Sequence, residues 1–488
     1  MTRRRPALVL LAVVSLTTAQ AAETPDPVGD HPRVADAVSA WSVWVEYQAA
    51  LDAVPGMSAA VVHDQEIVYL GASGFADPDN ERPAAPDTLY SICSISKLFT
   101  AIGVMQQRDR GALDLDEPLA TYLPWFAGLE DVHGDDEAIT LRRVLTHSAG
   151  LPRESDSPYW TGPEFDFPTR EAVRERLAEQ QTLYPSGRYF QYSNLGLSLA
   201  GEAVAAVTGT SWESYTHDHI LEPIGMADTF TSVAEADRTG RLAVGYSEHR
   251  GGVERERLAR FEAEGIAPAA GMVSSARDLA RFASWQMRLL DTGGEEVLRA
   301  ATLREMQRVH WVDPDWETTW GLGFAVFQLG DKTVVGHSGS CPGFYTTFRL
   351  VPRDRLAVIV LSNAIGTDVG LYAAKAIEII APALSEASKT TEPPAERDPD
   401  FDRYVGTYDT VWGRFAIVRW KDGLAVVDLD SRDPFDDLTT LEHVEGHTFR
   451  RVRSDDGSLG ETWRFAVDDR GRVLSVTSHS NPAVRLRD

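Results

Sequence analysis

Ser94 and Lys97 are three residues apart, a spacing that places a hydroxyl and an amine on one face of a helix. A serine hydroxyl is a poor nucleophile until a neighbouring group takes its proton, so the pair indicates covalent catalysis. One such pair arises easily by chance and is weak evidence alone. Its position strengthens it, because Ser94 opens a predicted helix over 94–110, where the dipole and free N–H groups favour a developing anion.

A second stretch with chemical potential is Tyr192-Ser193-Asn194, which follows a turn at 184–187. Tyrosine acts as a base only if its pKa falls from about 10 toward neutrality, and a nearby cation such as Lys97 favours the phenolate. Asn194 is suited to donate to a substrate carbonyl and to hold the lysine. Taken alone, this stretch is better interpreted as a loop with a buried tyrosine.

The third stretch, Gly336-His337-Ser338-Gly339, is expected to end a strand and start a turn. Its glycines let a substrate backbone approach closely. It superficially suggests a nucleophile elbow, but the fifth position is Ser340, so the pattern G-x-S-x-G is not met. The alternative interpretation is a tight strand end with a surface histidine.

The elements that must position these stretches are of mixed type. Apolar spacing predicts further helices over 34–51, 211–220, 278–290 and 369–384. Apolar runs predict strands at 57–62, 67–71, 320–328, 332–336, 346–351 and 356–361. Residues 385–400 are rich in proline, lack apolar periodicity and predict a linker. After the linker, short alternating runs broken by turn dipeptides predict an all-β module, a small barrel or sandwich.

The N-terminus has the features of a secretory signal. Arg3-Arg4-Arg5 is followed by a short apolar run and by small residues at Ala19-Gln20-Ala21. We therefore predict a signal peptide over 1–22 and an exported protein, periplasmic or extracellular. The apolar run is too short for a membrane span, so no stable membrane insertion is expected. A retained anchor is the alternative.

The composition and the net charge limit the classes of partner that the protein is expected to bind. The chain has 488 residues, of which 43% are hydrophobic and 25% charged, as in a globular protein of two or three domains. The formal net charge of -26 repels nucleic acid and anionic lipid. We expect a small-molecule or peptide substrate and no nucleic acid, while the sequence leaves the oligomeric state open.

The two cysteines, Cys93 and Cys341, lie beside the first and third stretches. If those stretches meet in one site, the sulfurs are neighbours, and in an exported protein they are expected to form a disulfide. Two unpaired buried thiols are the alternative.

Together the three stretches resemble the serine β-lactamase and penicillin-binding-protein superfamily. The closest match is its class C β-lactamase-like branch, which includes esterases, D-aminopeptidases and DD-peptidases. The resemblance covers roughly Val34 to Leu384. Order and spacing of the three stretches fit, and so do further landmarks at 145–152, 268–272 and 320–324.

The resemblance implies a role for each site residue. Ser94 matches the nucleophile, Lys97 the motif lysine and Tyr192 the tyrosine base. It also implies an oxyanion hole made by the backbone N–H groups of Ser94 and Ser340. The implied substrate-binding residues are Asn194, His337, Ser338, Gly339 and Ser340. The cysteine arrangement resembles the bridge of some carbapenem-hydrolysing class A enzymes. No cofactor or metal is implied, and His217-Asp218-His219 is expected at the surface because residues two apart on a helix diverge.

The implied fold is α/β (α+β), an antiparallel sheet flanked by helices plus an all-helical region. The predicted organisation is a signal peptide (1–22), a serine hydrolase domain (34–384), a linker (385–400) and a β-barrel-like domain (401–488). Tyr404-Val405-Gly406-Thr407-Tyr408 looks like the start of the barrel appended to some class C-like peptidases.

His337 departs from the family pattern, because true β-lactamases and DD-peptidases usually carry a lysine there. Histidine is mostly neutral near pH 7 and offers the substrate carboxylate no permanent cation. The expected function is therefore a serine hydrolase acting through an acyl-enzyme, a peptidase or amidase on small peptides of D-amino-acid type. The alternatives are a carboxylesterase or β-lactamase with the same site and, from another class, a non-catalytic penicillin-recognising sensor or scaffold.

Overall fold

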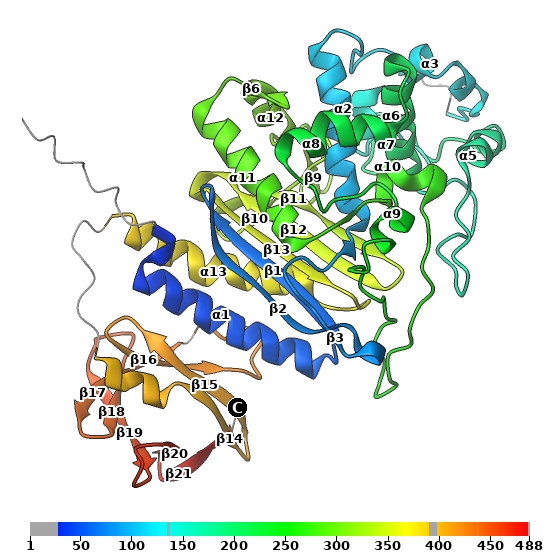
Figure 1. Ribbon diagram of the computed structural model, residues 1–488. Coiled ribbons are helices and arrows are strands. Elements are labelled where there is room, and N and C mark those ends of the chain that lie inside the picture. Colours follow the sequence, from blue (N-terminus) through cyan, green and yellow to red (C-terminus); the bar gives the residue numbers. More distant parts are fainter. Residues whose placement is uncertain (1–27, 134–136, 390–397, 437, 487–488) are drawn as a thin grey trace, which may run out of the picture.

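The computed structural model describes residues 28–133, 137–389, 398–436 and 438–486 (Figure 1). The predicted signal peptide and residues 390–397 of the predicted linker lie outside the described residues. Domain boundaries therefore stay predictions.

A nine-stranded sheet forms the centre of the described N-terminal part, in the order β3-β2-β1-β13-β12-β11-β10-β9-β8. Every pairing in it is antiparallel, as the fold prediction stated. Its strands are β1 (Gly56–His63), β2 (Glu66–Asp77), β3 (Arg82–Pro83), β8 (Trp311–Val312), β9 (Thr319–Trp320), β10 (Ala325–Leu329), β11 (Lys332–Cys341), β12 (Phe344–Val351) and β13 (Leu356–Ser362).

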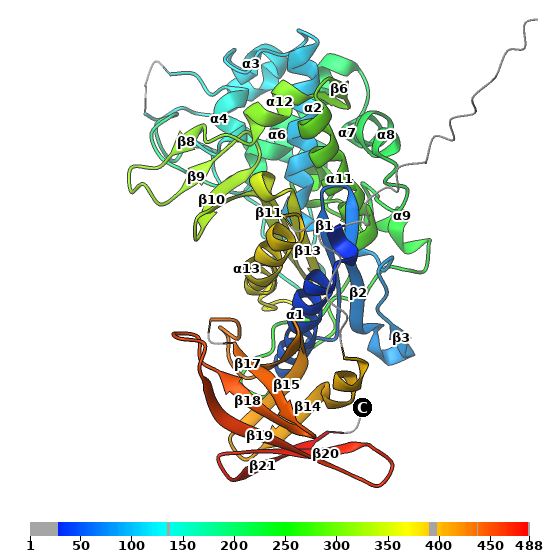
Figure 2. The ribbon, with the colours of Figure 1, turned by 90° about the vertical axis from the view of Figure 1, so that its left-hand side faces the viewer.

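Helices cover both faces of this sheet (Figures 1 and 2). Successive strand residues point to opposite faces, so β1 contributes Ala60 and Val62 to one apolar core and Ala59 and Val61 to the other. The first core contains α2 (Ser96–Asp109), α6 (Asn194–Thr208) and α11 (Ala276–Thr292). The second contains α1 (Pro32–Leu51) and α13 (Val369–Ala387). The site elements thus stand on a scaffold buried from both sides.

Shorter elements complete this part. The helices are α3 (Leu119–Tyr122), α4 (Leu141–Leu145), α5 (Arg170–Leu177), α7 (Trp212–Thr216), α8 (Glu222–Ile224), α9 (Val233–Asp237), α10 (Ala267–Ala270) and α12 (Ala300–Met306). Two small two-stranded sheets pair β4 (Tyr90–Ser91) with β5 (Val273–Ser274) and β6 (Glu295–Glu296) with β7 (Leu298–Arg299).

The C-terminal module is a closed barrel, which decides between the two architectures that the sequence allowed. Aromatic side chains such as Phe401, Tyr404 and Phe465 fill its interior. Its strands are β14 (Gly406–Thr410), β15 (Gly413–Trp420), β16 (Gly423–Asp428), β17 (Thr439–Glu445), β18 (Thr448–Val452), β19 (Leu459–Val467), β20 (Val473–Ser478) and β21 (Asn481–Arg485).

The barrel packs on the outer helices, so that α1 and α13 lie between it and the sheet (Figures 1 and 2). The Trp44 indole N–H donates to the Ser431 backbone oxygen over 2.8 Å. Lys375 pairs with Asp433 over 2.7 Å. The barrel is therefore attached by both apolar and polar contacts.

Several predicted elements need correction. The expected strand over 320–328 is interrupted, because a turn separates β9 from β10. The third stretch does not end a strand: β11 continues through it to Cys341. The helix expected over 211–220 is only partly α-helical, since His217–Leu221 form a π-helix.

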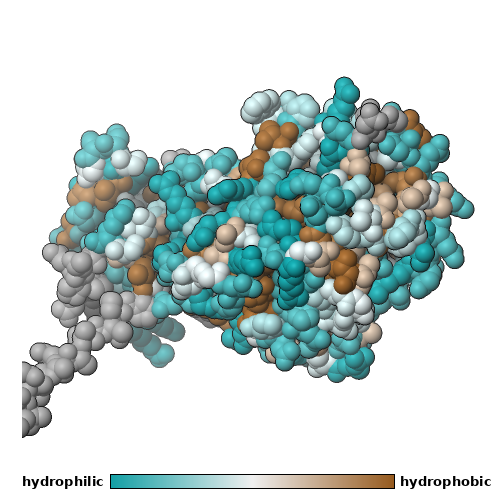
Figure 3. Space-filling view, turned by 90° about the horizontal axis from the view of Figure 1, so that it is seen from above, coloured by the Kyte–Doolittle hydropathy of each residue, from teal (hydrophilic) through white to brown (hydrophobic). Residues whose placement is uncertain are grey.

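None of the helices among the described residues combines the length and apolar character needed to cross a membrane. The face seen from above is largely hydrophilic, with hydrophobic residues in scattered small groups (Figure 3).

Candidate active site

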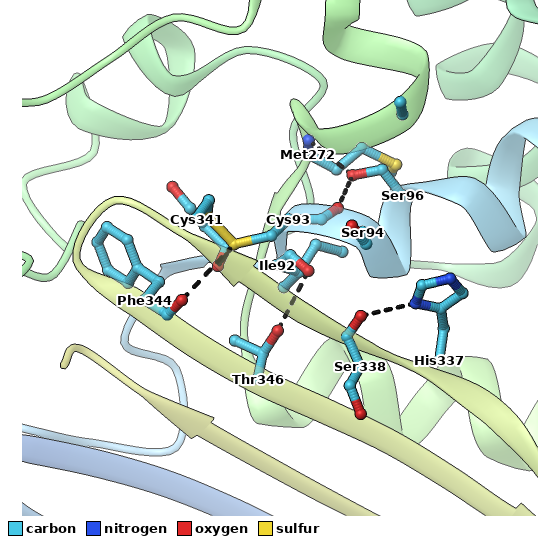
Figure 4. Close-up of a disulfide and its surroundings, with 12 residues drawn as sticks. Ile92, Cys93, Ser94, Ser96, Met272, His337, Ser338, Cys341, Phe344 and Thr346 are labelled. Atoms are coloured by element: carbon cyan, nitrogen blue, oxygen red, sulfur yellow. Dashed lines mark hydrogen bonds between the residues drawn. A yellow bond between two sulfur atoms is a disulfide. The ribbon is translucent and has the colours of Figure 1, made fainter. Parts of the chain in front are cut away.

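Ser94 lies in a 3-10 turn, Cys93–Ile95, directly before α2. The helix therefore begins two residues later than predicted. The turn is held from behind: the Ser96 hydroxyl donates to the Cys93 oxygen over 2.6 Å, and the Met272 N–H donates to the same hydroxyl over 3.0 Å (Figure 4). Ser94 itself is half-buried and lines the main cavity.

Strand β11 is fastened to the same turn. Thr346 on the neighbouring strand donates from Oγ1 to the Ile92 oxygen over 3.1 Å (Figure 4). Cys93 and Cys341 form a disulfide, with Cα atoms 5.7 Å apart. A Cβ atom at Gly339 would come within 2.2 Å of the Ile92 oxygen, so only glycine fits there. The two residues of the expected oxyanion hole, Ser94 and Ser340, thus each adjoin one half of the disulfide.

Lys97 is almost fully buried beneath Ser94. Its Nζ lies 3.1 Å from Ser94 Oγ and donates to Asn194 Oδ1 over 2.7 Å and to the Ala269 backbone oxygen over 2.8 Å. Burial lowers the pKa of Lys97 well below its ordinary value, because the ammonium loses its hydration; Glu154 partly opposes this shift. The site therefore favours a neutral amine beside the nucleophile.

Tyr192 lines the same cavity as Ser94. Burial raises its pKa, and a hydrogen bond with the Ser94 hydroxyl acts in the opposite direction. The expectation that Lys97 brings the phenol toward neutrality is thus wrong: desolvation dominates, and the phenol keeps its proton. The Lys97 Nζ lies 4.9 Å from the ring centroid, and so does the Arg153 guanidinium carbon.

His147 positions this tyrosine. In the sequence, His147 was visible only as part of the landmark at 145–152 and had no assigned role. Its ring centroid lies 4.2 Å from that of Tyr192, and its Nδ1 accepts the Ser193 backbone N–H over 3.1 Å. Burial lowers the pKa of His147 well below its ordinary value, so the ring is neutral.

Glu154 is a site residue that the sequence reasoning missed. Its Oε1 accepts from Asn194 Nδ2 over 2.8 Å, and its other oxygen accepts from the Tyr159 hydroxyl. It lines the cavity and lies 3.3 Å from Arg153 Nε. The available signal was its place two residues after the landmark at 145–152.

His337 is buried, in contrast to the surface position that was the alternative. Only 7% of the residue is exposed. Its Nδ1 lies 2.6 Å from the Ser338 backbone oxygen (Figure 4). The pKa of His337 is lowered to about 3, mainly by burial, and a protonated Lys97 adds to this lowering. The ring is therefore neutral at physiological pH.

A cavity of about 820 Å³ joins these groups, a size typical of small-ligand sites. Aromatic side chains, among them Trp160, Phe165 and Trp320, form much of its wall. Of the predicted site residues, those lining it are Ser94, Tyr192, Asn194, His337, Ser338, Gly339, Ser340 and Cys341. Lys97 and Cys93 lie behind this surface.

The remaining histidine motif lies elsewhere. His217 Nδ1 and Asp218 Oδ1 are 2.8 Å apart and both side chains are largely exposed. Within the described ranges, no group of three or more His, Cys, Asp or Glu residues could hold a metal ion.

A protein-family model described as Beta-lactamase matches residues 45–381. A curated relative is the D-alanyl-D-alanine-carboxypeptidase/endopeptidase AmpH of Escherichia coli (strain K12). It is 26% identical over 363 residues, covering 72% of this chain and 89% of AmpH.

Solved structures show the same architecture. The octameric penicillin-binding protein homologue from Pyrococcus abyssi matches with a TM-score of 0.63 and 24% identity, covering 92% of this chain and 100% of that chain. The D-amino acid amidase from Ochrobactrum anthropi SV3, solved with L-phenylalanine amide, matches with a TM-score of 0.59 and 26% identity. That match covers 72% of this chain and 99% of the amidase.

Proposed function

The chain belongs to the beta-lactamase family, and from this premise we propose that it is an exported serine hydrolase that forms an acyl-enzyme at Ser94. The observation that carries the proposal is the surroundings of Lys97. Two of its three polar neighbours, Asn194 Oδ1 and the Ala269 oxygen, can only accept hydrogen bonds. A neutral amine satisfies both with its two N–H groups and turns its lone pair toward the Ser94 hydroxyl.

Acylation follows from this arrangement. The lone pair of Lys97 takes the Ser94 proton while Oγ forms a bond to the substrate carbonyl carbon. The backbone N–H groups of Ser94 and Ser340 are the proposed donors to the developing oxyanion. Tyr192 is protonated at the start of the reaction. It donates its proton to the leaving amine and then takes one from the Lys97 ammonium. The bond from the carbonyl carbon to the leaving group then breaks.

Deacylation uses the same groups in reverse. Water takes the place of the leaving group. While its oxygen attacks the acyl carbon, its proton passes to Tyr192 and the proton of Tyr192 passes to Lys97. Ser94 leaves with a proton from the Lys97 ammonium, and the carboxylic acid product departs. Glu154 takes no part in these transfers; it holds the amide of Asn194.

We propose amides or small peptides of D-amino-acid type as the substrates. The names of AmpH and of the D-amino acid amidase support this class. The aromatic wall of the cavity suits an apolar acyl side chain. β-Lactam hydrolysis is disfavoured, because the neutral ring of His337 offers no cation to the carboxylate of a β-lactam.

Export is part of the proposal. Its support is the signal-like pattern of residues 1–22 together with the Cys93–Cys341 disulfide, since such bonds persist mainly in oxidising compartments.

A fluorophosphonate probe tests the nucleophile. We expect covalent labelling of the wild type and of Ser284→Ala, a control serine on α11, and no labelling of Ser94→Ala. A Ser94→Ala protein that labels as strongly as the wild type would refute the assignment. The rates of cleavage of p-nitrophenyl esters, D-alanyl peptides and a chromogenic cephalosporin would then rank the substrate classes. Cleavage of the esters alone would favour a carboxylesterase.

A further inference from the structure

The main cavity reaches both faces of β11. Pairing with β10 ends at Gly336, so beyond this residue the described part of the sheet leaves one edge of β11 open. Val335 belongs to the first apolar core and Val334 to the second, and side chains alternate along a strand. His337 therefore points to the face of α2, whereas Ser338 points to the face of α13.

On the α13 side, the wall of the cavity comes from β12 and from the segment that leads from β13 into α13. We call this part the α13 lobe and define it by Tyr345, Thr367, Asp368 and Gly370. Asp368 is the charged member of the lobe. Its Oδ1 accepts the Leu371 N–H over 3.1 Å and so caps α13, which leaves Oδ2 for another partner.

The barrel supplies that partner. Arg432, on the loop between β16 and β17, donates from Nη2 to Asp368 Oδ2. The two side chains are 56% and 43% exposed, so a ligand can reach the pair. The loop is also held by other bonds, because Gln48 of α1 donates from Nε2 to the Leu429 oxygen over 2.6 Å. Together with the barrel contacts described above, this bond should keep the loop in place without the charge of Arg432.

Arg349 is an additional cation behind this lobe. A Cβ atom placed at Gly370 would come within 3.1 Å of its Nη2. Among the described residues, no carboxylate lies within ion-pair distance of Arg349, and its guanidinium lies over the Phe327 ring, 5.3 Å from the centroid. The negative charge of Asp368 acts on it. With Arg432 in place, these three charged groups carry one net positive charge.

Glu248 and Arg255 also lie against the segment 363–370, and each has an opposite charge beside it. Glu248 pairs with Arg250 over 2.7 Å, and the charge of Asp52 acts on Arg255. The other charged residues that line the described cavity wall pair with each other over 3.3 Å: Arg153 and Glu154. The excess positive charge is therefore at the α13 lobe.

We propose that the α13 lobe takes an anionic group of the substrate, and that Arg432 is a specificity-determining residue contributed by the barrel. Without this guanidinium, the carboxylate of Asp368 would face the anionic group and repel it. The inference rests on the proposed serine hydrolase function. It narrows the substrates to those with a carboxylate remote from the reacting bond, such as peptides with an acidic residue.

Three fluorophosphonates with the same alkyl chain, ending in a carboxylate, a methyl group or a trimethylammonium group, test this charge preference. In each reaction Ser94 Oγ bonds to phosphorus, fluoride leaves, and the serine proton passes to Lys97. The second-order rate constant of labelling is measured at about 0.15 M salt, where a Debye length of about 8 Å screens remote surface charges. We expect the wild type to react faster with the carboxylate probe than with the trimethylammonium probe.

Arg432→Gln should slow the carboxylate probe about five-fold, accelerate the trimethylammonium probe about five-fold and change the methyl probe less than about two-fold. Asp368→Asn keeps a cap for α13 and should have the opposite effects. The double variant should return the ratio of the two charged probes to the wild-type value. Arg453→Gln is the matched control, because it removes the same charge from another arginine–aspartate pair of the barrel and should leave all three rates unchanged.

The outcomes separate this inference from the function beneath it. If Arg432→Gln changed the rates of all three probes equally, or changed none, the ion pair would be a purely structural contact and the inference would be overturned. Thermal unfolding of each variant checks that the fold is kept. Labelling that depends on Ser94 but not on the charge of the probe refutes the role of Arg432 alone, whereas labelling that does not depend on Ser94 refutes both proposals.

Discussion

The side-chain amide of Asn194 donates from Nδ2 to Glu154 Oε1 over 2.8 Å. This bond fixes which way the amide faces, so its oxygen is turned toward Lys97 Nζ, 2.7 Å away. Glu154 therefore acts on the nucleophile only through two other side chains and is a positioning residue.

Substitution of Glu154 separates its geometry from its charge. Glu154→Ala removes the acceptor that orients Asn194, and we expect kcat to fall about ten-fold. Glu154→Gln keeps an acceptor oxygen but removes the charge that raises the pKa of Lys97, so this pKa should fall further. The rising limb of the pH–rate profile should then move to lower pH, with little loss of kcat above it. If the rising limb of the pH–rate profile of Glu154→Gln moved to higher pH instead, the proposed effect of Glu154 on Lys97 would be refuted.

Lys97 is expected to act as the base in its neutral form. Since burial lowers its pKa, the fraction of neutral amine, and with it the acylation rate, should rise with pH through a limb well below the usual lysine range. Lys97→Met should reduce kcat/KM by about 10²–10⁴. Lys332→Met, the same change at an ion-paired lysine at the start of β11, is the control and should stay active. Stopped-flow measurement of the acylation rate from pH 5 to 10 tests this prediction.

Tyr192 is expected to serve as a proton donor, because its pKa is raised. Tyr192→Phe should therefore harm substrates whose leaving group must be protonated. We expect the loss in kcat/KM to be at least about ten-fold larger for an amide than for a p-nitrophenyl ester of the same acid. Equal losses on the two substrates would instead place the tyrosine in a step that both share.

Gly339 allows β11 to approach the nucleophile turn. In Gly339→Ala the new methyl group would meet the Ile92 oxygen, which must move, and Ser94 moves with it. We expect activity to be lost and the free energy of unfolding to fall by about 1–3 kcal/mol. Gly460→Ala is the matched control, because its methyl group would lie at an ordinary 3.6 Å from the nearest atom. Denaturant unfolding and probe labelling of both variants test this prediction.

The sequence predicted the type and order of the main elements well. The helix predicted over 34–51 is α1 (Pro32–Leu51), and the strands predicted at 57–62 and 67–71 are β1 and β2, because long apolar patterns reflect burial in a core. The predicted boundaries differ more from the structure. The third stretch lies inside β11 because its ladder with β12 continues to Cys341, and pairing with a distant strand leaves no local signal.

The sequence predicted which residue types form the candidate site. It could not predict the protonation states of these residues. A lysine near a tyrosine suggests a phenolate, yet burial of both groups reverses that conclusion, and burial depends on the packed structure. Glu154 was missed for a similar reason. Its loop has no periodicity, and only the folded chain brings it to Asn194.

The disulfide joins residues separated by 248 positions, and most of the hydrolase region lies within that ring. A protease that cuts once anywhere between Cys93 and Cys341 would release no fragment, because both pieces remain covalently attached beside Ser94. If the protein is exported as proposed, the nicked molecule would keep its reacting groups assembled until a reductant opened the ring.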